Sequence, residues 1–304
     1  MNILVTGGAG FIGSHLTSSL LEDGHSVTIY DSLINSSEEN AKRLQKLDAN
    51  FICGDITDFE NLSNSVSGHD ICIHLAAQID VLHSINDPQY NNLVNISGTK
   101  NVLNSCVKHN VNVIAASSAA VYEESHEPLS ETSSIKPQSP YGESKLAMEQ
   151  LLDDYSKIHE INCLGLRMFN VYGKGQNINY AGVITKFLEN IKNGTDLTIF
   201  GDGNSTRDFV SIDDVIDAIV LSIQKIGQNK GRVFNIASGI STKIVELAET
   251  MISISNDDSI SIRYAPMNSG EIINSQADIS LARKSLDFCP KLSLRDGLEQ
   301  LIKP

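Results

Sequence analysis

The chain has few basic residues for its size. It contains 23 lysines and arginines against 37 aspartates and glutamates in 304 residues, a formal net charge of −14. Nucleic acids and anionic membranes attract proteins through basic surfaces, so this charge argues against either one as the main partner. An anionic ligand must therefore be held by local donors.

Paired cysteines and long apolar runs are also missing. The five cysteines, Cys53, Cys72, Cys106, Cys163 and Cys289, are far apart and form no C-x-x-C motif. This pattern predicts reduced, buried thiols rather than disulfides or a metal site. No apolar run approaches the roughly 18 residues of a membrane span, and the first residues already read as a strand. We therefore expect a cytoplasmic protein with no membrane partner and no metal.

A glycine-rich turn near the start of the chain carries the first functional signal. The stretch TGGAGFIGSH, residues 6–15, follows the apolar run 3–5 and contains Gly7, Gly10 and Gly13 at intervals of three. The first glycine permits a tight turn, the second lets the backbone approach a pyrophosphate, and the third lets the helix pack on its strand. The pattern predicts a dinucleotide-binding strand, turn and helix, although a structural turn that binds nothing is the alternative.

The second predicted strand, residues 26–30, ends on Asp31. An acidic side chain there accepts hydrogen bonds from a ribose diol and repels a 2′-phosphate. No lysine or arginine follows until Lys42. The sequence therefore predicts NAD rather than NADP as the cofactor.

Later strand ends add further candidate residues. A third strand at 50–53 leads to Asp55, which is placed either to accept from an adenine amino group or to cap the next helix. The fourth strand, 70–74, leads into residues 75–77, which are suited to lie flat against a cofactor. His74 is predicted to be a core histidine, because no second ligand stands at metal spacing.

A serine and a tyrosine–lysine pair come after the fifth predicted strand, residues 111–116. Ser118 lies at its carboxyl end, where open α/β sheets place their chemistry. The next helix, predicted from 139 to about 160, carries Tyr141 and Lys145 four residues apart on one face. Tyr141 is the only tyrosine of this chain with a lysine at that offset.

Together these segments resemble the extended short-chain dehydrogenase/reductase family. The resemblance rests on TGGAGFIGSH, Asp31, Gly54-Asp55-Ile56, Leu75-Ala76-Ala77, Ser118 and Tyr141-x-x-x-Lys145. The second half resembles the nucleotide-sugar epimerases of that family through residues 167–173, 200–203, 207–210, Gly270-Glu271 and 277–279. The resemblance implies a Rossmann-like, doubly wound parallel sheet in residues 1–168 and a smaller α/β substrate domain in residues 169–304. It also implies that part of 206–238 returns to the sheet.

The resemblance implies a role for each candidate residue. NAD would be bound by Gly7, Gly10, Phe11, Ile12, Gly13, Asp31, Asp55, Ile56, Leu75, Ala76, Ala77, Tyr141 and Lys145. A UDP-sugar would contact Ser118, Asn170, Phe200, Arg207 and Ser275, with Asn170 and Arg207 at the diphosphate and Phe200 beside the uracil. Ser118, Tyr141 and Lys145 would be catalytic. A homodimer would pair the helices at 89–109 and 143–159. Apart from the resemblance, periodicity predicts residues 89–109 as one long amphipathic helix, with an apolar face formed by Leu93, Ile96, Val102, Leu103 and Val107.

Tyr141 needs help to act as a base. A free tyrosine has a pKa near 10, so a base near neutral pH requires a shift worth about 4 kcal/mol. A lysine at about 6 Å supplies about 2.8 kcal/mol at an effective dielectric constant of about 20. A second positive charge is required, and oxidised nicotinamide would supply it. Ser118 would hydrogen-bond the same sugar hydroxyl.

The two residues after Ser118 indicate the reaction type. In this family, sugar-nucleotide 4,6-dehydratases carry an Asp-Glu pair there, and this chain has Ala119 and Ala120. Without those proton carriers the keto sugar is reduced again, which favours a 4-epimerase of UDP-hexoses. The alternatives are a reductase or another epimerase of nucleotide sugars, including hexuronates, and a non-catalytic nucleotide sensor.

Two substrate positions depart from the usual pattern of relatives. Asn268 replaces an arginine, so Arg263 or Lys174 is a candidate to hold the diphosphate instead. Ser275 matches the position of a bulky aromatic residue in hexose-restricted epimerases, which predicts room for N-acetylated sugars. The alternative is that Ser275 is a spacer in a site filled by other side chains such as Tyr180.

Overall fold

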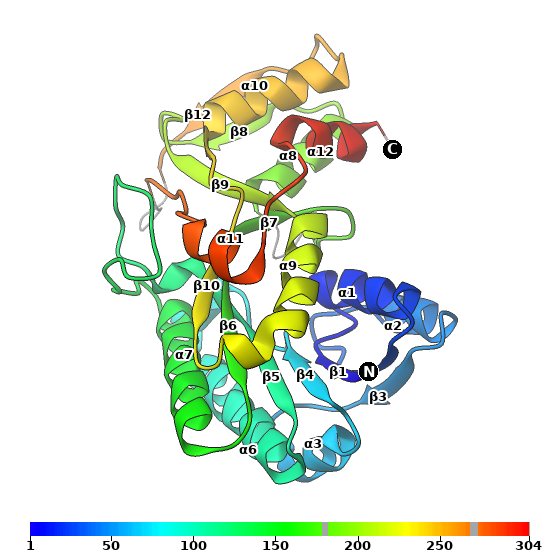
Figure 1. Ribbon diagram of the computed structural model, residues 1–304. Coiled ribbons are helices and arrows are strands. Elements are labelled where there is room, and N and C mark those ends of the chain that lie inside the picture. The colour runs from blue at the N-terminus through cyan, green and yellow to red at the C-terminus, as the bar shows by residue number, and fades with distance from the viewer. Residues whose placement is uncertain (178–181, 268–272, 304) are drawn as a thin grey trace.

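The computed structural model describes residues 1–177, 182–267 and 273–303 of the chain. Its main sheet consists of β1 (Asn2–Thr6), β2 (Ser26–Asp31), β3 (Asn50–Cys53), β4 (Ile71–His74), β5 (Asn112–Ser118), β6 (Cys163–Met168) and β10 (Val233–Ile236). All seven are parallel, in the order β10-β6-β5-β4-β1-β2-β3 (Figure 1). The order reverses between β1 and β4, where sheets of this kind bind their ligands.

Helices cover both faces of the main sheet. They are α1 (Phe11–Glu22), α2 (Glu38–Gln45), α3 (Phe59–Val66), α6 (Thr99–His109), α7 (Pro140–Ile158), α9 (Ile212–Lys225) and α11 (Ser280–Leu286). The apolar core on one face joins the sheet to α1, α9 and α11, and the core on the other face joins it to α3, α6 and α7 (Figure 1). β4 and β6 are buried on both faces; β4 is apolar up to its last residue, His74, whereas β6 also contains the buried Arg167. The predicted α/β, Rossmann-like fold is confirmed.

A smaller lobe is built from the later part of the chain. Its elements are β7 (Asn170–Tyr172), β8 (Leu197–Phe200), β9 (Thr206–Ser211), β11 (Ser241–Lys243), β12 (Ile262–Ala265), α8 (Val183–Lys192), α10 (Ile244–Ser255) and α12 (Leu294–Ile302). β9 lies between β7 and β11, and β8 pairs with β12. Between β9 and β11 the chain returns through α9 and β10 to the larger lobe, where β10 pairs with β6.

The region between β4 and β5 differs from the predicted amphipathic helix. It contains α4 (Val81–Asn86), α5 (Pro88–Asn92), the π-helical turn η1 (Leu93–Gly98) and α6. The expected burial of Leu93 is wrong, since it is 50% exposed, and Asn91 and Asn95 are buried instead. A π-helical turn holds more residues than an α-helical turn, so it rotates the side chains out of the regular pattern.

The cysteines are all free, but they are not all buried. Cys72, Cys106 and Cys163 lie in the core, whereas Cys53 and Cys289 are exposed. The expected burial is wrong for Cys53 because it ends β3, which is an edge strand. Among the described residues there is no group of three His, Cys, Asp or Glu side chains arranged to hold a metal. Within the same ranges, none of the helices has the length and apolarity needed to cross a membrane.

Candidate active site

The turn between β1 and α1 shows why glycines occupy it. Gly7 has a φ of 70°, in the left-handed region that favours glycine. A Cβ on Gly7 would lie 2.7 Å from the backbone nitrogen of Ala76, and a Cβ on Gly13 would lie 2.2 Å from the carbonyl oxygen of Gly7. Helix α1 begins at Phe11, directly after Gly10. The first N–H groups of a helix have no acceptor within it, so this end of α1 suits a phosphate.

Asp31 braces two loops as well as facing the ligand cavity. One of its carboxylate oxygens, Oδ2, accepts from the N–H of Ala9 at 3.0 Å. The other, Oδ1, accepts from the N–H of Leu33 at 2.9 Å and from the hydroxyl of Ser36 at 2.7 Å. A carboxylate has about four acceptor positions, so Asp31 can still accept from a ribose hydroxyl.

Asp55 does not cap the helix that comes after it. Asp58 caps α3 by accepting from the N–H of Asn61 at 3.2 Å. Asp55 instead accepts from the N–H and the hydroxyl of Thr57, both at 2.8 Å through Oδ1. Its predicted contact with adenine stays a prediction.

His74 is a buried core histidine held in one orientation. Its Nδ1 lies 2.8 Å from the hydroxyl of Thr6, and its Nε2 lies 3.0 Å from the hydroxyl of Thr99. Thr99 donates its own proton to the carbonyl of Asn95 at 2.6 Å, so it accepts from His74 Nε2–H, and Thr6 donates to Nδ1. Burial and, second, the charge of Lys145 lower the pKa of His74 to about 3, so the ring is neutral near pH 7.

The three predicted catalytic residues meet where β5 ends and α7 begins. Ser118 is the last residue of β5, and its hydroxyl accepts from the N–H of Ala120 at 3.2 Å. Ser118 therefore also caps the short 3₁₀ helix η2 (Ala119–Val121). Tyr141 lies in the first turn of α7, and Lys145 Nζ lies 5.8 Å from the centroid of its ring. We call Ser118, Tyr141 and Lys145 the catalytic floor.

Gly142 allows these two segments to approach each other. A Cβ on Gly142 would lie 2.4 Å from the carbonyl oxygen of Ala120 and 3.0 Å from Cβ of Pro137. Only a residue without a side chain lets the first turn of α7 pack this closely on the turn after Ser118.

The protonation of the catalytic floor depends on burial. Burial raises the pKa of Tyr141, and its hydrogen bond with Ser118 acts in the opposite direction. Burial lowers the pKa of Lys145 to about 8, while the negative charge of Glu149 raises it. Because burial opposes ionisation of Tyr141, the need for positive charge beside the phenol is greater than the sequence suggests.

Buried asparagines that the sequence analysis missed hold the start of α7. The side-chain amide of Asn91 donates to the carbonyl of Pro140 at 3.1 Å, and that of Asn95 donates to the hydroxyl of Ser144 at 3.0 Å. Ser144 donates in turn to the carbonyl of Tyr141 at 2.7 Å. The available sequence signal was the spacing of four residues between the two asparagines, which puts them on one face of a helix.

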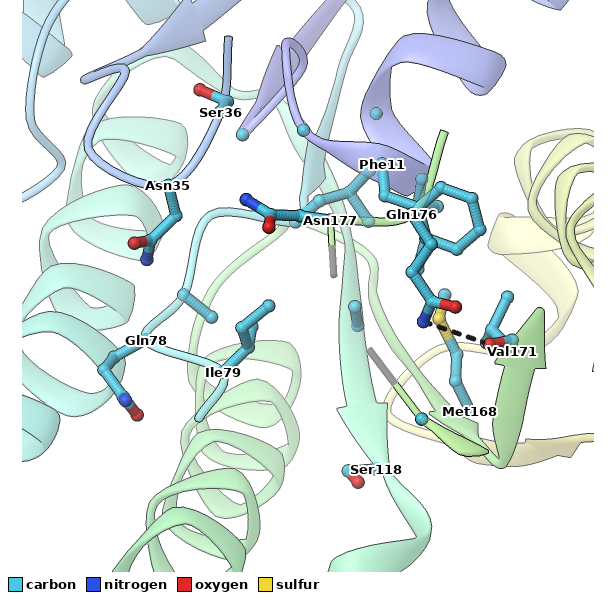
Figure 2. A pocket seen from close by; sticks show the side chains of 18 of the residues that line it. Phe11, Asn35, Ser36, Gln78, Ile79, Ser118, Met168, Val171, Gln176 and Asn177 are labelled. Carbon is cyan, nitrogen blue, oxygen red and sulfur yellow. Dashed lines mark hydrogen bonds between the residues drawn. The ribbon is translucent and has the colours of Figure 1, made fainter. Parts of the chain in front are cut away.

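A cavity of about 1420 Å³ lies between the two lobes. Figure 2 shows Phe11 on one side of it and Ser118 at the end of β5 on the other, with Gln78 and Ile79 from the loop after β4. Every predicted cofactor residue lines this cavity: Gly7, Gly10, Phe11, Ile12, Gly13, Asp31, Asp55, Ile56, Leu75, Ala76, Ala77, Tyr141 and Lys145. The described part of the chain therefore brings the whole predicted set together.

The smaller lobe supplies the far side of the cavity. Asn170, Phe200 and Arg207 all line it, and we call them the substrate wall. Asn170 donates to the carbonyl of Asp208 at 3.1 Å, and Arg207 donates to the carbonyl of Thr206 at 2.8 Å. The planar guanidinium of an arginine suits a diphosphate.

Other predicted substrate positions are not brought into the cavity. Ser275 is buried, its N–H lies 3.4 Å from the hydroxyl of Thr206, and it is not among the lining residues. Arg263 pairs with Asp196, and neither Arg263 nor Lys174 lines the cavity. Lys186 of α8 does line it. The remaining positions of the prediction, Tyr180, Asn268, Gly270 and Glu271, lie outside the described residues.

The cavity fits a dinucleotide such as NAD. Gly7, Gly10 and Gly13 line the cavity before and at the start of α1 and carry no side chains, so a pyrophosphate can approach the backbone there. Asp31 places a carboxylate at the end of β2, and Lys145 places an ammonium near the catalytic floor. The carboxylate of Asp31 and the ammonium of Lys145 thus line the same cavity, with the guanidinium of Arg207 on its opposite wall.

Sequence comparison identifies relatives over almost the whole chain. The model of the NAD dependent epimerase/dehydratase family matches residues 3–237. A UDP-glucose 4-epimerase of Mycolicibacterium smegmatis is 34% identical over 310 residues, covering 100% of this chain and 98% of that protein. A UDP-N-acetyl-alpha-D-glucosaminuronate decarboxylase of Bacillus cytotoxicus is 31% identical over 316 residues, covering 99% of this chain and 96% of that protein. Relatives of this chain therefore include more than one reaction type.

Solved structures are also similar to this chain over almost its whole length. The UDP-glucose 4-epimerase of Thermotoga maritima, solved with UDP-glucose, has a TM-score of 0.93 and 35% identity, covering 100% of this chain and 98% of that one. The UDP-N-acetylglucosamine 4-epimerase of Methanobrevibacter ruminantium, solved with UDP-N-acetylmuramic acid, has a TM-score of 0.93 and 34% identity, covering 99% and 97%. Both structures are those of nucleotide-sugar 4-epimerases.

Proposed function

The chain belongs to the NAD-dependent epimerase/dehydratase family, and from this premise we propose that it is a 4-epimerase of UDP-hexoses and their N-acetyl forms. The family makes NAD the cofactor, and the residues along the cavity fit it. The proposed reaction oxidises the sugar at C4 to a transient ketone and reduces it again from the opposite face. No net redox change results, so the cofactor is regenerated in each cycle.

The observation that carries the proposal is the composition of the catalytic floor. Two hydroxyl groups, of Ser118 and Tyr141, and the ammonium of Lys145 stand together at the end of β5. The next two residues, Ala119 and Ala120, offer no acid or base for eliminating water. The floor can therefore move a proton at one hydroxyl, which is what interconversion of an alcohol and a ketone requires.

Each residue of the catalytic floor has a defined task. Tyr141 takes the proton of the C4 hydroxyl and later returns it to the ketone oxygen. Ser118 hydrogen-bonds that same oxygen, and Lys145 supplies positive charge that favours the tyrosinate. Bound NAD supplies the acceptor, and then the donor, of the hydride at C4.

The substrate wall would hold the nucleotide while the keto sugar rotates to present its opposite face. Arg207 and Asn170 line the cavity and would bind the diphosphate, and the exposed ring of Phe200 would contact the uracil. Lys186 of α8 also lines the cavity, whereas Arg263 and Lys174 do not. Lys186 is therefore our candidate for the positive charge at the diphosphate that relatives obtain from an arginine at the position of Asn268.

A panel of nucleotide sugars tests the proposal. Purified protein is incubated with UDP-glucose, UDP-N-acetylglucosamine and UDP-glucuronate, without added NAD, and products are followed by NMR. We expect conversion of the first two to their galactose-type epimers. Loss of carbon dioxide from the uronate or stoichiometric consumption of added NAD(H) would instead identify a decarboxylase or a reductase.

We also propose that the protein is a homodimer that pairs the helices at 89–109 and 143–159. Large apolar side chains are exposed beside these helices: Leu82 and Ile85 of α4, Leu93 of η1 and Ile158 of α7. Burial of such side chains favours association. A monomeric mass by light scattering at assay concentration would contradict the dimer.

A further inference from the structure

A buried ion pair lies directly behind the catalytic floor. Glu149 follows Lys145 by one turn of α7, and its carboxylate binds Arg167 of β6 through both oxygens, at 2.8 Å from Nε and 2.7 Å from Nη2. The hydroxyl of Ser117, next to Ser118, donates to Glu149 Oε1 at 2.5 Å. Glu149 and Arg167 are 7% and 4% exposed.

Arg167 is itself fixed from the other side. Its Nη1 donates to the hydroxyl of Tyr122 at 2.8 Å, and Tyr122 donates to the side-chain oxygen of Asn235 on β10 at 2.6 Å. The guanidinium also lies 4.7 Å from the centroid of the Tyr122 ring. These contacts hold the arginine in place, so that both oxygens of Glu149 accept a charge-assisted hydrogen bond.

Stability alone does not account for this pair. Replacing a buried ion pair by apolar side chains of similar volume is often neutral or stabilising, so burial of Glu149 and Arg167 brings little net gain to folding. The position of the charge is more informative. Glu149 lies one turn from Lys145 on the same helix face and is the group that opposes the effect of burial on the lysine.

The surroundings of Lys145 leave that task to Glu149. His74, on the neighbouring strand β4, is neutral, and Tyr141 is uncharged until it acts as the base. The ammonium donates one proton to the carbonyl of Ala116 at 2.8 Å. Within the described part of the chain, the carboxylate of Glu149 binds Arg167 and Ser117. It therefore favours the protonated form of Lys145 through its charge and leaves the other two ammonium protons of Lys145 available.

We propose that Glu149 is a positioning residue for the reaction, whose carboxylate, held by Arg167 and Ser117, keeps Lys145 protonated beside Tyr141. The inference rests on the proposed roles of Tyr141 and Lys145. If Glu149 loses its charge, Lys145 gives up its proton at lower pH and Tyr141 loses the cation that favours its ionisation. Glu149 also repels the tyrosinate directly, but it is two helical turns from Tyr141, so this opposite effect is smaller.

The ionisation of Tyr141 tests the inference without any sugar substrate. Protein loaded with NAD⁺ is titrated while the ultraviolet absorbance of tyrosinate is recorded, and the Tyr141→Phe curve is subtracted to isolate Tyr141. In Glu149→Gln we expect the pKa of Tyr141 to rise by about one unit, a tenfold loss of tyrosinate at a given pH below it. Asp153→Asn is the matched control, since it removes an exposed carboxylate from the next turn of α7.

A second variant protects the test against misfolding. Glu149→Gln leaves Arg167 buried without a counter-charge, whereas the double variant Glu149→Gln/Arg167→Gln removes both charges and keeps polar partners. The same rise is expected in the double variant. The inference is overturned if Tyr141 titrates as in the wild type in the variants that fold, or if the wild type shows no titration step that Tyr141→Phe removes. A shifted titration in a protein that converts no UDP-sugar would contradict the proposed function alone.

Discussion

The catalytic floor and the substrate wall face each other across one cavity, but their side chains are held differently. Lys145 is 5% exposed and sits among buried groups that bind one another, whereas Phe200 is 44% exposed at the end of β8. Substitution in the floor leaves buried polar groups without partners, and substitution in the wall mostly changes what the cavity offers to a ligand. Under the proposed function we therefore expect proton transfer to depend on the packing of the larger lobe, and substrate choice to depend on a few side chains of the smaller one.

The largest effect is expected from removing the base. Tyr141→Phe deletes one hydroxyl and little volume, so turnover should fall by about 10²- to 10⁴-fold while NAD stays bound. Turnover is measured by NMR with UDP-glucose, and NAD is measured after denaturation. Tyr155→Phe is the control on the same helix, because its hydroxyl binds Asn104 away from the cavity. Undiminished turnover in Tyr141→Phe would exclude Tyr141 as the base.

The packing of the floor gives the next effect. A methyl group at Gly142 would meet the carbonyl of Ala120 at 2.4 Å and push Tyr141 away from Ser118. We expect Gly142→Ala to lower kcat by about 100-fold with NAD still bound, since small displacements of reacting groups cost about that much. Gly227→Ala is the control, because a Cβ there meets nothing within 4 Å. Equal kcat in the two variants would show that the floor tolerates displacement.

The substrate wall should respond in KM rather than in kcat. Arg207→Met removes a charged donor from the cavity, and such hydrogen bonds are worth about 1.5–3 kcal/mol, so KM for a UDP-sugar should rise roughly 10- to 100-fold. Arg263→Met provides the comparison, since Arg263 is exposed, pairs with Asp196 and does not line the cavity. A fall in kcat at constant KM would place Arg207 in the catalytic floor instead.

Ser275 gives the smallest and most selective effect. Its N–H lies 3.4 Å from the hydroxyl of Thr206, which precedes Arg207 of the substrate wall, and because Ser275 is buried, a much larger side chain there has to displace its neighbours. We expect Ser275→Tyr to lose UDP-N-acetylglucosamine and to keep UDP-glucose. Ser275→Ala, which adds no bulk, is the control. Equal loss of both substrates, or a wild type that never converts the N-acetyl sugar, would contradict a role for Ser275 in sugar size.

The sequence predicted which residues line the cavity better than it predicted the contacts that support them. Gly7, Gly13 and Asp31 could be located because each lies at or next to a strand end and its turn, where local sequence determines the contacts. Glu149 and Arg167 could not, since their pairing depends on how α7 packs on β6. The burial of Asn91 and Asn95 was missed for a similar reason, because a π-helical turn changes which residues face the core.

The return of the chain to the main sheet limits how lobes can be exchanged between relatives. After leaving the sheet at β6, the chain comes back for α9 and β10, leaves again for β11, and comes back once more for α11 (Figure 1). In a chimera joined only at residue 168, β10 of the second protein would have to pair with β6 of this chain, and α9 of the second protein would have to pack on α1 of this chain. Modular grafting of the smaller lobe therefore needs several junctions that leave 212–236 and 280–288 with the host. Under the proposed function, point substitution in the substrate wall needs no such junctions and is the simpler way to change which sugar is accepted.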